Sequence, residues 1–346
     1  MQLPEFPYLY GKPKGQALLR VQPDDFVVEE TLSFTPTGAG EHLLLFIEKI
    51  GQNTQFVAKQ LADIVGCKAR QVSYAGLKDR HAVTRQWFCV PFPIKQEPDW
   101  LNWQIEGCRI LQVTRHQRRL RLGAIAHNSF HLRLRDLSAP QELEQRLELV
   151  QQGVPNYYGE QRFGRDGGNL ALAERLFNGG SITDRQIRGL ALSAARSFLF
   201  NTQLARRLEL GVFNTLLQGE VVQLDGSGSV FKVDQPDEVL LQRLALFDLH
   251  PTAALAGCGE PLVQGEALEF EQQSLHNWQH WVDALIALNM RAERRAVRLV
   301  PRQLQWRREG QDICLSFQLY AGCFATAVLR ELVNYQDVQR HQAPLD

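Results

Sequence analysis

The sequence lacks both a long apolar run and an excess of charge of either sign. Its 346 residues are 44% hydrophobic and 22% charged, a composition typical of soluble globular proteins. No apolar run approaches the roughly 18 residues that a membrane helix needs. The first residues show no basic stretch followed by an apolar core, so we predict neither a signal peptide nor a membrane span. The length is compatible with about two domains, each with a substantial core.

Cysteine pairs and metal-binding patterns are also missing. The six cysteines are scattered, with no C-x-x-C pair and no metal-like spacing to a histidine, which predicts buried free thiols in a cytoplasmic protein. The nine histidines form no H-x-x-x-H or H-E-x-x-H motif, so we expect no metal site. A G-x-S-x-G elbow is absent, and the segment 164–168 lacks the Gly-Lys-Ser/Thr ending of a phosphate loop.

Basic and acidic residues balance at 38 each, which argues against an indiscriminate nucleic-acid coat but permits local basic patches. One run carries four arginines within seven residues: Arg115, Arg118, Arg119 and Arg121. A second set, spaced as on one face of a helix, comprises Arg291, Arg294, Arg295 and Arg298. Either set is a candidate for phosphate contacts, and a solvated loop or helix face is the alternative.

The pattern of elements changes twice along the chain. Strand-like runs dominate residues 17–135, with one helix over 55–64 that Thr54 could cap and another over 141–152. Helical periodicity covers 170–177, 184–210, 234–246 and 266–297. Strands return at 304–306 and 313–319, before a last helix near 325–332. We therefore predict an α+β (mixed α/β) fold, with one discontinuous domain, residues 1–153 plus 299–346, interrupted by a mostly helical inserted domain, residues 154–298.

The segment 76–86, GLKDRHAVTRQ, carries the clearest chemical feature. Gly76 breaks a strand-like run and permits a sharp turn. Asp79 then lies between Lys78 and Arg80, two cations that would favour an ionised carboxylate. A charged carboxylate at a strand end is a candidate nucleophile or base. A solvated charged turn explains the same residues.

Several segments, taken together and in order, resemble the TruD family of tRNA pseudouridine synthases. The segments that carry the resemblance are 25–30 (DFVVEE), 76–86, 128–130 (NSF), 154–164 (VPNYYGEQRFG), 192–197 (LSAARS) and 321–326 (AGCFAT). The second and fourth are the most specific, and together the segments span nearly the whole chain. The resemblance implies a pseudouridine synthase catalytic domain, with an antiparallel-rich sheet and flanking helices, and a family-specific insert.

The resemblance also implies an activity and a site. It implies isomerisation of uridine 13 in the D-arm of tRNA, classically tRNA for glutamate, to pseudouridine, without a cofactor or metal. Asp79 resembles the nucleophile, and Arg20 resembles the basic residue that pairs with it. Phe26, Asn128 and Phe324 resemble residues that hold the target nucleotide, and Phe130 resembles the aromatic residue that stacks on the uracil.

A target uridine in folded RNA must be flipped out at a cost of a few kcal/mol, and basic residues that grip phosphates could offset this cost. The candidate RNA contacts are Lys78, Arg115, Arg118, Arg119, Arg121, Arg162, Arg295 and Arg298. Two alternatives stay open at this point. A non-catalytic RNA-binding or RNA-folding protein would use the same basic and aromatic residues, and a metal-dependent nuclease would need clustered carboxylates. No self-association stripe is visible, so a monomer is the expected state.

Overall fold

The computed structural model describes residues 3–339; residues 1–2 and 340–346, the outer ends of the predicted discontinuous domain, lie outside them. The chain divides into two compact units. The sheet unit comprises Pro13–Gln145, Pro301–Ala325 and Val333–Asp346, and the helical unit comprises Met1–Lys12, Arg146–Val300 and Thr326–Leu332. Within the described residues, no helix combines the length and apolarity needed to cross a membrane.

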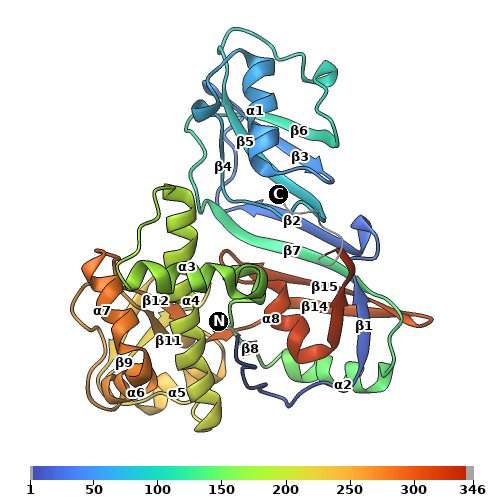
Figure 1. Ribbon diagram of the computed structural model, residues 1–346. Helices are drawn as coiled ribbons and strands as arrows, with labels where there is room; N and C mark the ends of the chain where they lie inside the picture. Colours follow the sequence, from blue (N-terminus) through green and yellow to red (C-terminus); the bar gives the residue numbers. More distant parts are fainter. Residues whose placement is uncertain (1–2, 340–346) are drawn as a thin grey trace. The chain divides into compact units, whose positions relative to one another are not determined.

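The sheet unit is built on an eight-stranded sheet in the order β14-β15-β7-β2-β5-β3-β6, with β4 paired to β5 (Figure 1). Its strands are β2 Phe26–Leu32, β3 His42–Lys49, β4 Ser73–Tyr74, β5 Val83–Pro91, β6 Cys108–His116, β7 Ile125–Leu134, β14 Arg302–Glu309 and β15 Asp312–Tyr320. All pairs in this sheet are antiparallel except β2–β5. A separate parallel pair joins β1 Gln16–Leu19 to β16 Asn334–Asp337. The predicted antiparallel-rich α+β fold is confirmed.

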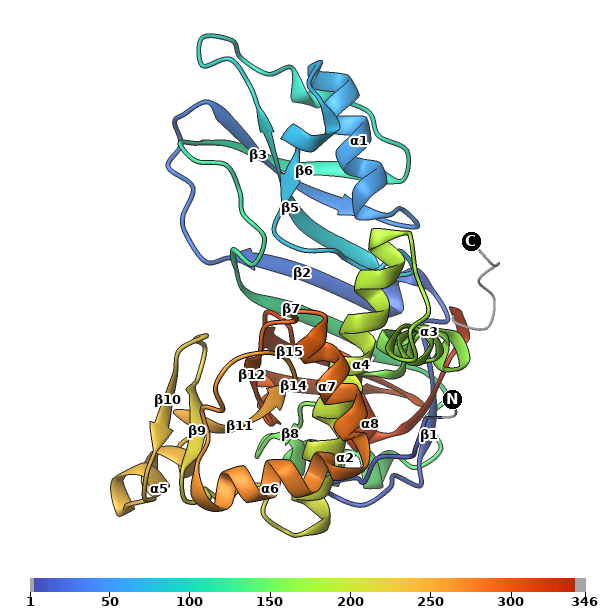
Figure 2. The ribbon, with the colours of Figure 1, turned by 60° about the vertical axis from the view of Figure 1, so that its left-hand side comes forward.

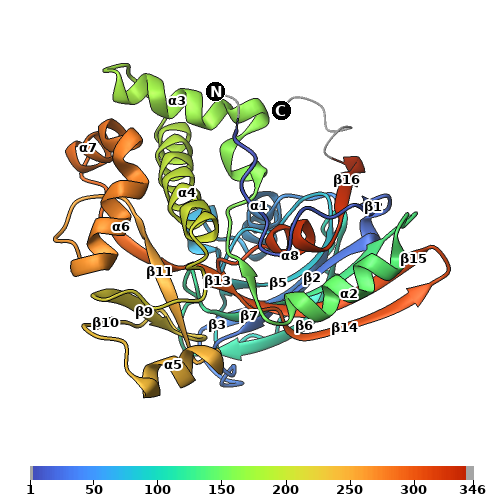
Figure 3. The same ribbon diagram turned by 90° about the horizontal axis from the view of Figure 1, so that it is seen from below.

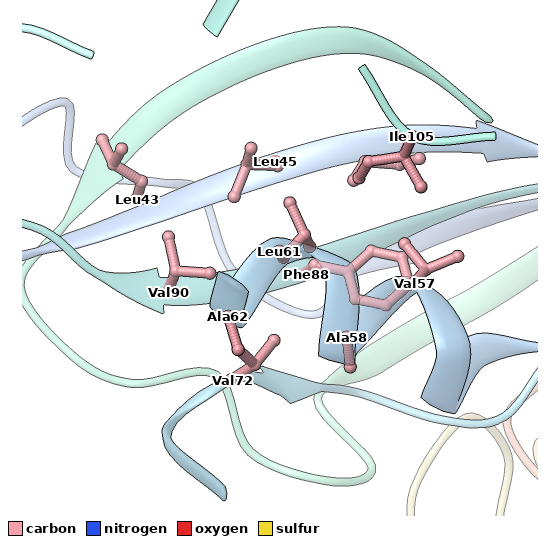
Figure 4. Packing of buried hydrophobic residues seen from close by; sticks show 11 residues of the cluster. Leu43, Leu45, Val57, Ala58, Leu61, Ala62, Val72, Phe88, Val90 and Ile105 are labelled. Atoms are coloured by element: carbon pink, nitrogen blue, oxygen red, sulfur yellow. The ribbon is translucent and has the colours of Figure 1, made fainter. Parts of the chain in front are cut away.

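Strand β3 shows why a continuous apolar run forms an inner strand. Leu43, Leu45 and Ile47 point to one face, and Leu44 belongs to a separate cluster on the other face. Both faces are buried, which accounts for the lack of hydrophobic–polar alternation in β3. Helix α1 Thr54–Val65 covers the first face (Figure 2), where Val57, Ala58, Leu61 and Ala62 pack against β3 and β5 (Figure 4).

The helical unit is organised around α4 Arg185–Glu209, a 25-residue helix predicted at 184–210. Its side chains from Ala191 to Leu204 are largely buried, and α3 packs against it (Figures 1 and 2). The Asp184 carboxylate caps the first turn by accepting the N–H groups of Gln186 and Ile187. The other helices of this unit are α3 Gly168–Phe177, α5 Glu238–Ala245, α6 Gly265–Leu275 and α7 Gln279–Ala287.

The remaining elements are short or lie at the limits of the units. Helices α2 Pro140–Val150 and α8 Ala325–Leu332 each contain a boundary between the two units. Short 3-10 helices occur at Pro23–Asp25, Ala69–Gln71, Trp100–Asn102, Glu160–Phe163, Arg165–Gly167 and His276–Trp278.

The segment predicted as a helical insert also contains β structure. A four-stranded antiparallel sheet in the order β10-β9-β11-β12 is formed by β9 Glu220–Leu224, β10 Val230–Val233, β11 Leu249–Leu255 and β12 Glu293–Ala296. Strand β13 Arg298–Leu299 pairs with β8 Val154–Pro155. The helix predicted over 266–297 therefore ends at Ala287, and the prediction is wrong beyond that point. Strand β12 is short and charged, and its conformation follows from pairing with β11, which local periodicity does not report.

Candidate active site

The loop that carries Asp79 joins β4 to β5 and is fixed at several points of its main chain. The Gln86 amide donates to the Gly76 carbonyl at 3.1 Å. The Lys78 N–H donates to the Thr54 hydroxyl at 3.1 Å, and that hydroxyl donates to Gln86 at 2.9 Å. Thr54 is thus the first residue of α1 and a support of the loop, whereas Asn53 occupies the cap position. These hydrogen bonds hold the main chain of the loop in a defined geometry.

A buried lysine of strand β3 binds main-chain carbonyls of the same loop. Lys49 is 0% exposed. Its Nζ donates to the Asp79 carbonyl at 2.8 Å and to the Gln52 carbonyl at 2.9 Å, and it makes a longer contact with the Lys78 carbonyl. Burial lowers the pKa of Lys49 to about 8, and the charge of Asp79 opposes this shift. Lys49 was not among the predicted site residues. The sequence did offer one indication that Lys49 is buried: it continues the alternation of the inward-facing Leu43, Leu45 and Ile47.

The Asp79 carboxylate contacts Arg20 and not its neighbours in sequence. Arg20 Nη1 donates to Asp79 Oδ2, and the His81 N–H donates to Oδ1 at 2.9 Å. The Asp79 side chain is 30% exposed, compared with 4% for Arg20. Arg80 instead donates to the Gly51 carbonyl at 3.0 Å. One carboxylate oxygen therefore accepts from a cation, the other from the main chain, and the group remains accessible.

Lys78 is held in the interior by an acid of strand β2. Its Nζ lies 2.6 Å from Glu30 Oε2, and the two side chains are 8% and 0% exposed. The second oxygen of Glu30 accepts the Trp87 N–H at 3.3 Å. A contact between Lys78 and an RNA phosphate, as predicted from the sequence, would require this buried ion pair to open.

Phe26, Asn128 and Phe130 lie on one face of the sheet. Val28 pairs with Phe130 and Glu30 with Asn128 in the β2–β7 register, so alternate residues of both strands share this face. The Arg20 guanidinium lies 4.9 Å above the Phe26 ring, and Lys78 reaches Glu30. These contacts place the Asp79 loop over the same face.

The aromatic rings of this face contact one another. The rings of Phe26 and Phe130 meet edge to face at 6.2 Å, and Phe317 stacks on Phe130 at 5.4 Å. Phe26 and Phe130 are buried. The Oδ1 atom of Asn128 is buried without a hydrogen-bond partner in the described residues, and such an atom can accept from a ligand.

Phe324 lies beyond the end of β15. The turn is closed by the Cys323 N–H, which donates to the Tyr320 carbonyl at 3.2 Å. Because Leu319 pairs with Asn128, this turn follows the end of β15 at which Asn128 lies. The contacts of the site join Arg20, Asp79, Phe26 and Phe130, and strand register adds Asn128. Phe324 is related to them through its position after the end of β15.

The arginines of segment 115–121 differ in availability. Arg118 and Arg121 are exposed. The Arg115 guanidinium donates to the carbonyls of Gly40, Pro93 and Gln96, and Arg119 donates to that of Arg70. Arg118 and Arg121 are therefore the best phosphate-binding candidates of this segment.

The prediction that the arginines of residues 291–298 share one face of a helix is wrong. Arg294 and Arg295 are in β12, Arg298 is in β13, and neighbouring strand residues point to opposite sides. Arg298 is 4% exposed and donates to the carbonyls of Leu244 and Leu249. Its predicted contact with RNA would require Arg298 to leave these carbonyl partners.

Arg295 and Arg162 belong to an aromatic cluster of the helical unit. The Arg295 guanidinium lies 4.2 Å from the centroid of the Tyr158 ring and donates to Asn156 Oδ1 at 2.6 Å. Arg162 approaches the same ring at 5.2 Å. These contacts give both arginines a structural role in the motif 154–164.

The described residues contain no group of three histidine, cysteine or acidic side chains close enough to hold a metal ion. The six cysteines are free thiols. The acidic cluster that a two-metal nuclease would use is thus not formed in this part of the chain.

Comparisons with known proteins identify the family. A family model described as tRNA pseudouridine synthase D (TruD) matches residues 4–181 and 169–332. The chain is 46% identical to a tRNA pseudouridine synthase D of Aeromonas salmonicida over 336 residues, covering 97% of this chain and 96% of the relative. Identity to the protein of the same name from Pseudoalteromonas atlantica is 41% over 344 residues, or 98% of each chain.

A solved structure shares the fold. The crystal structure of a Methanosarcina mazei protein described as a tRNA pseudouridine synthase D superimposes with a TM-score of 0.72 over 94% of this chain and 95% of that one, at 20% identity. The matches extend over nearly the entire chain and include the Asp79 loop, both faces of the sheet and the helical unit. The chain belongs to the tRNA pseudouridine synthase D (TruD) family.

Proposed function

We propose that this protein isomerises a uridine of tRNA to pseudouridine, with Asp79 as the nucleophile. Support comes from the names of its relatives and from the geometry at Asp79. The observation that carries the proposal is a single accessible carboxylate, held by Arg20 and by the His81 N–H, over a sheet face that presents aromatic rings. A direct guanidinium contact stabilises the negative charge that a nucleophile requires.

The reaction breaks the bond between C1′ and N1 and forms a bond between C1′ and C5. The proton at C5 is released and N1 takes up a proton, so no oxidant, reductant or other co-reactant is needed. Asp79 could add to C6 of the base, attack C1′, or remove the proton at C2′ of the sugar. All three routes begin with an ionised Asp79 that approaches the target nucleotide directly.

The aromatic face and Asn128 are suited to retaining the base while it is detached. Phe26 and Phe130 supply apolar surface on which a pyrimidine could pack, and the unpartnered Asn128 Oδ1 could accept from a uracil N–H. We assign Phe324 to nucleotide binding as well, from the family resemblance. Arg118 and Arg121 are the phosphate contacts we propose in the sheet unit.

We further propose that the target is uridine 13 in the D-arm, and that a tRNA substrate is met in the cytoplasm. The proposed catalytic domain comprises residues 1–153 plus 299–346, with residues 154–298 as the insert. All the residues assigned to chemistry and to the target base lie in the sheet unit, whereas residues 3–12, 146–153 and 326–332 of the proposed catalytic domain group with the helical unit.

The test uses tRNA transcripts that carry tritium at C5 of uridine. Wild type should release tritium from tRNA, and Asp79→Asn should release none above background while it binds tRNA normally. Asp63→Asn, an exposed acid of α1, is the matched control and should match wild type. Full activity in Asp79→Asn would refute the nucleophile assignment.

Chemical mapping of pseudouridine in the product tests the position. A single modified site at uridine 13 is expected, and a modified site elsewhere would overturn that part of the proposal. Tight tRNA binding with no tritium release by wild type would favour the alternative, an RNA-binding protein without chemistry.

A further inference from the structure

We propose that Asp337 is a positioning residue for the reaction: it holds Arg20 in the orientation in which Arg20 contacts Asp79. This inference rests on the proposed function and adds a residue to its site. Nothing in the local sequence singles out Asp337, which lies 258 positions after Asp79 and 317 after Arg20. The structure brings the three side chains together through the parallel pairing of β1 and β16.

The strand register places Asp337 beside Arg20. Leu19, the last residue of β1, pairs with Asp337, the last residue of β16 (Figure 3). Arg20 follows directly and donates through Nη2 to Asp337 Oδ2 at 2.6 Å. The other end of the guanidinium, Nη1, donates to Asp79. One planar cation is thus held at both ends by two different carboxylates.

This geometry differs from that of an ordinary structural ion pair in the same unit. Arg135 binds Asp25 through Nε and Nη2, and both carboxylate oxygens accept, at 2.7–3.0 Å. In contrast, Arg20 Nε and Asp337 Oδ1 are buried and make no hydrogen bond within the described residues. A bidentate pair would satisfy both atoms. The split arrangement leaves them unsatisfied, at a cost in stability, and in return keeps Nη1 directed at Asp79.

The backbone of Arg20 is strained in a way that serves the same orientation. Its φ is +59°, in the left-handed region, which costs a residue with a Cβ about 1–2 kcal/mol. Local strain of this kind persists where surrounding contacts over-determine the conformation, and it often marks functional positions. The contacts to Asp337, Asp79 and the Phe26 ring are the ones that hold Arg20 here.

Exposure separates the roles of the two acids. The Asp79 side chain is 30% exposed and the Asp337 side chain 10%. Asp79 is accessible to a substrate, whereas the Asp337 carboxylate contacts Arg20 alone among residues 3–339.

The test is the single-turnover rate of tritium release, measured with Asp337→Asn, Asp337→Ala and Asp337→Glu. We expect the rate to fall about 10- to 100-fold in Asp337→Ala, the range for a misplaced catalytic group. The Kd for tRNA should stay within about twofold. Asp337→Asn, which keeps an acceptor oxygen, should lose less than Asp337→Ala, and Asp337→Glu should recover part of the rate.

Two controls distinguish positioning from general damage. Asp312 is another partly buried acid of the sheet unit, paired with Arg133 at 2.8 Å, and Asp312→Asn should keep the wild-type rate. In an Arg20→Ala background, Asp337→Ala should cause no further loss, because Asp337 acts through Arg20. An equal additional loss there, or wild-type rates in all Asp337 variants, would overturn the inference.

The outcome is separable from that of the proposed function. Tritium release by wild type with unimpaired Asp337 variants would refute this inference alone. If wild type releases no tritium, a crystal structure of Asp337→Ala still decides the point. Rotation of the Arg20 guanidinium away from Asp79 is expected, and an unmoved guanidinium would refute the positioning role.

Discussion

The buried pair of Lys78 and Glu30 offers a quantitative test of what Lys78 does. Its nitrogen and oxygen lie 2.6 Å apart, in side chains that are 8% and 0% exposed. Removing one partner of a buried ion pair leaves an uncompensated charge and typically costs about 3–5 kcal/mol. Lys78→Met should therefore lower the free energy of unfolding by this amount. The urea midpoint should fall by about 1–5 M, for a denaturant slope of about 1–3 kcal/mol per M.

The double variant Glu30→Gln/Lys78→Met removes both charges together. It should regain most of the stability lost in Lys78→Met, since replacing both members of a buried pair is often nearly neutral. Unfolding would be followed by tryptophan fluorescence, because the Trp87 side chain is buried in the native structure and its main-chain N–H donates to Glu30. Lys59→Met, on the exposed side of α1, is the matched control and should stay within about 0.5 kcal/mol of wild type.

A role in RNA binding would give the opposite pattern. Lys78→Met would then keep its stability, and tRNA affinity would fall together with its dependence on salt, by a slope of about 0.9 for each lost phosphate contact. That result would refute the assignment of Lys78 to the interior of the protein. It would also mean that Glu30 is stabilised by a different group.

Four further variants test the environments of individual residues. Burial raises the pKa of Tyr10 to about 12, so Tyr10 ionises at lower pH in the unfolded chain than in the folded protein. Its stabilising contribution is full below pH 10 and is lost between pH 10 and 12, at most about 3 kcal/mol. The difference in unfolding free energy between wild type and Tyr10→Phe should therefore narrow over that range. Gly40 has φ +132°, and an added Cβ would lie 2.2 Å from the His116 carbonyl oxygen, so Gly40→Ala should lower the urea-unfolding free energy by more than about 1 kcal/mol. Arg121→Ala should reduce the salt slope of tRNA binding by about 1 at unchanged stability, and an unchanged slope would contradict a phosphate contact. Arg298→Ala should lower the melting temperature, and an unchanged melting temperature would contradict its structural role.

Local periodicity predicted the elements that are stabilised by their own pattern. The helix predicted at 184–210 is confirmed as Arg185–Glu209. It could be predicted because its apolar stripe and its capping residue both lie within one continuous segment. Local periodicity did not predict strand β12. Its sequence, Glu-Arg-Arg-Ala, is charged and has no strand-like alternation, and it becomes a strand through pairing with β11.

The candidate site shows the same limit more sharply. The acid at position 79 could be singled out from its own segment, but its neighbours Lys78 and Arg80 appeared to be its charge partners. Both contact other groups in the structure. The partner that does contact Asp79 lies 59 positions away, and Lys49, which holds the Asp79 carbonyl, lies 30 positions away. Strand register creates these contacts, and no local pattern encodes them.

Four of the charged side chains around this loop form a set in which positive and negative charges balance. Arg20 and Lys49 supply two positive charges, and Asp79 and Asp337 supply two negative ones. Arg20, Lys49 and Asp337 are buried, and Asp79 alone has substantial exposure. A buried charge is tolerated only when it is paired. Arg20 contacts both acids, so substitution of either acid should alter the other through Arg20. The effects of Asp337 and Arg20 variants should therefore be strongly non-additive, and the double-mutant comparison in the Arg20→Ala background is the measurement that decides whether the set acts as one unit.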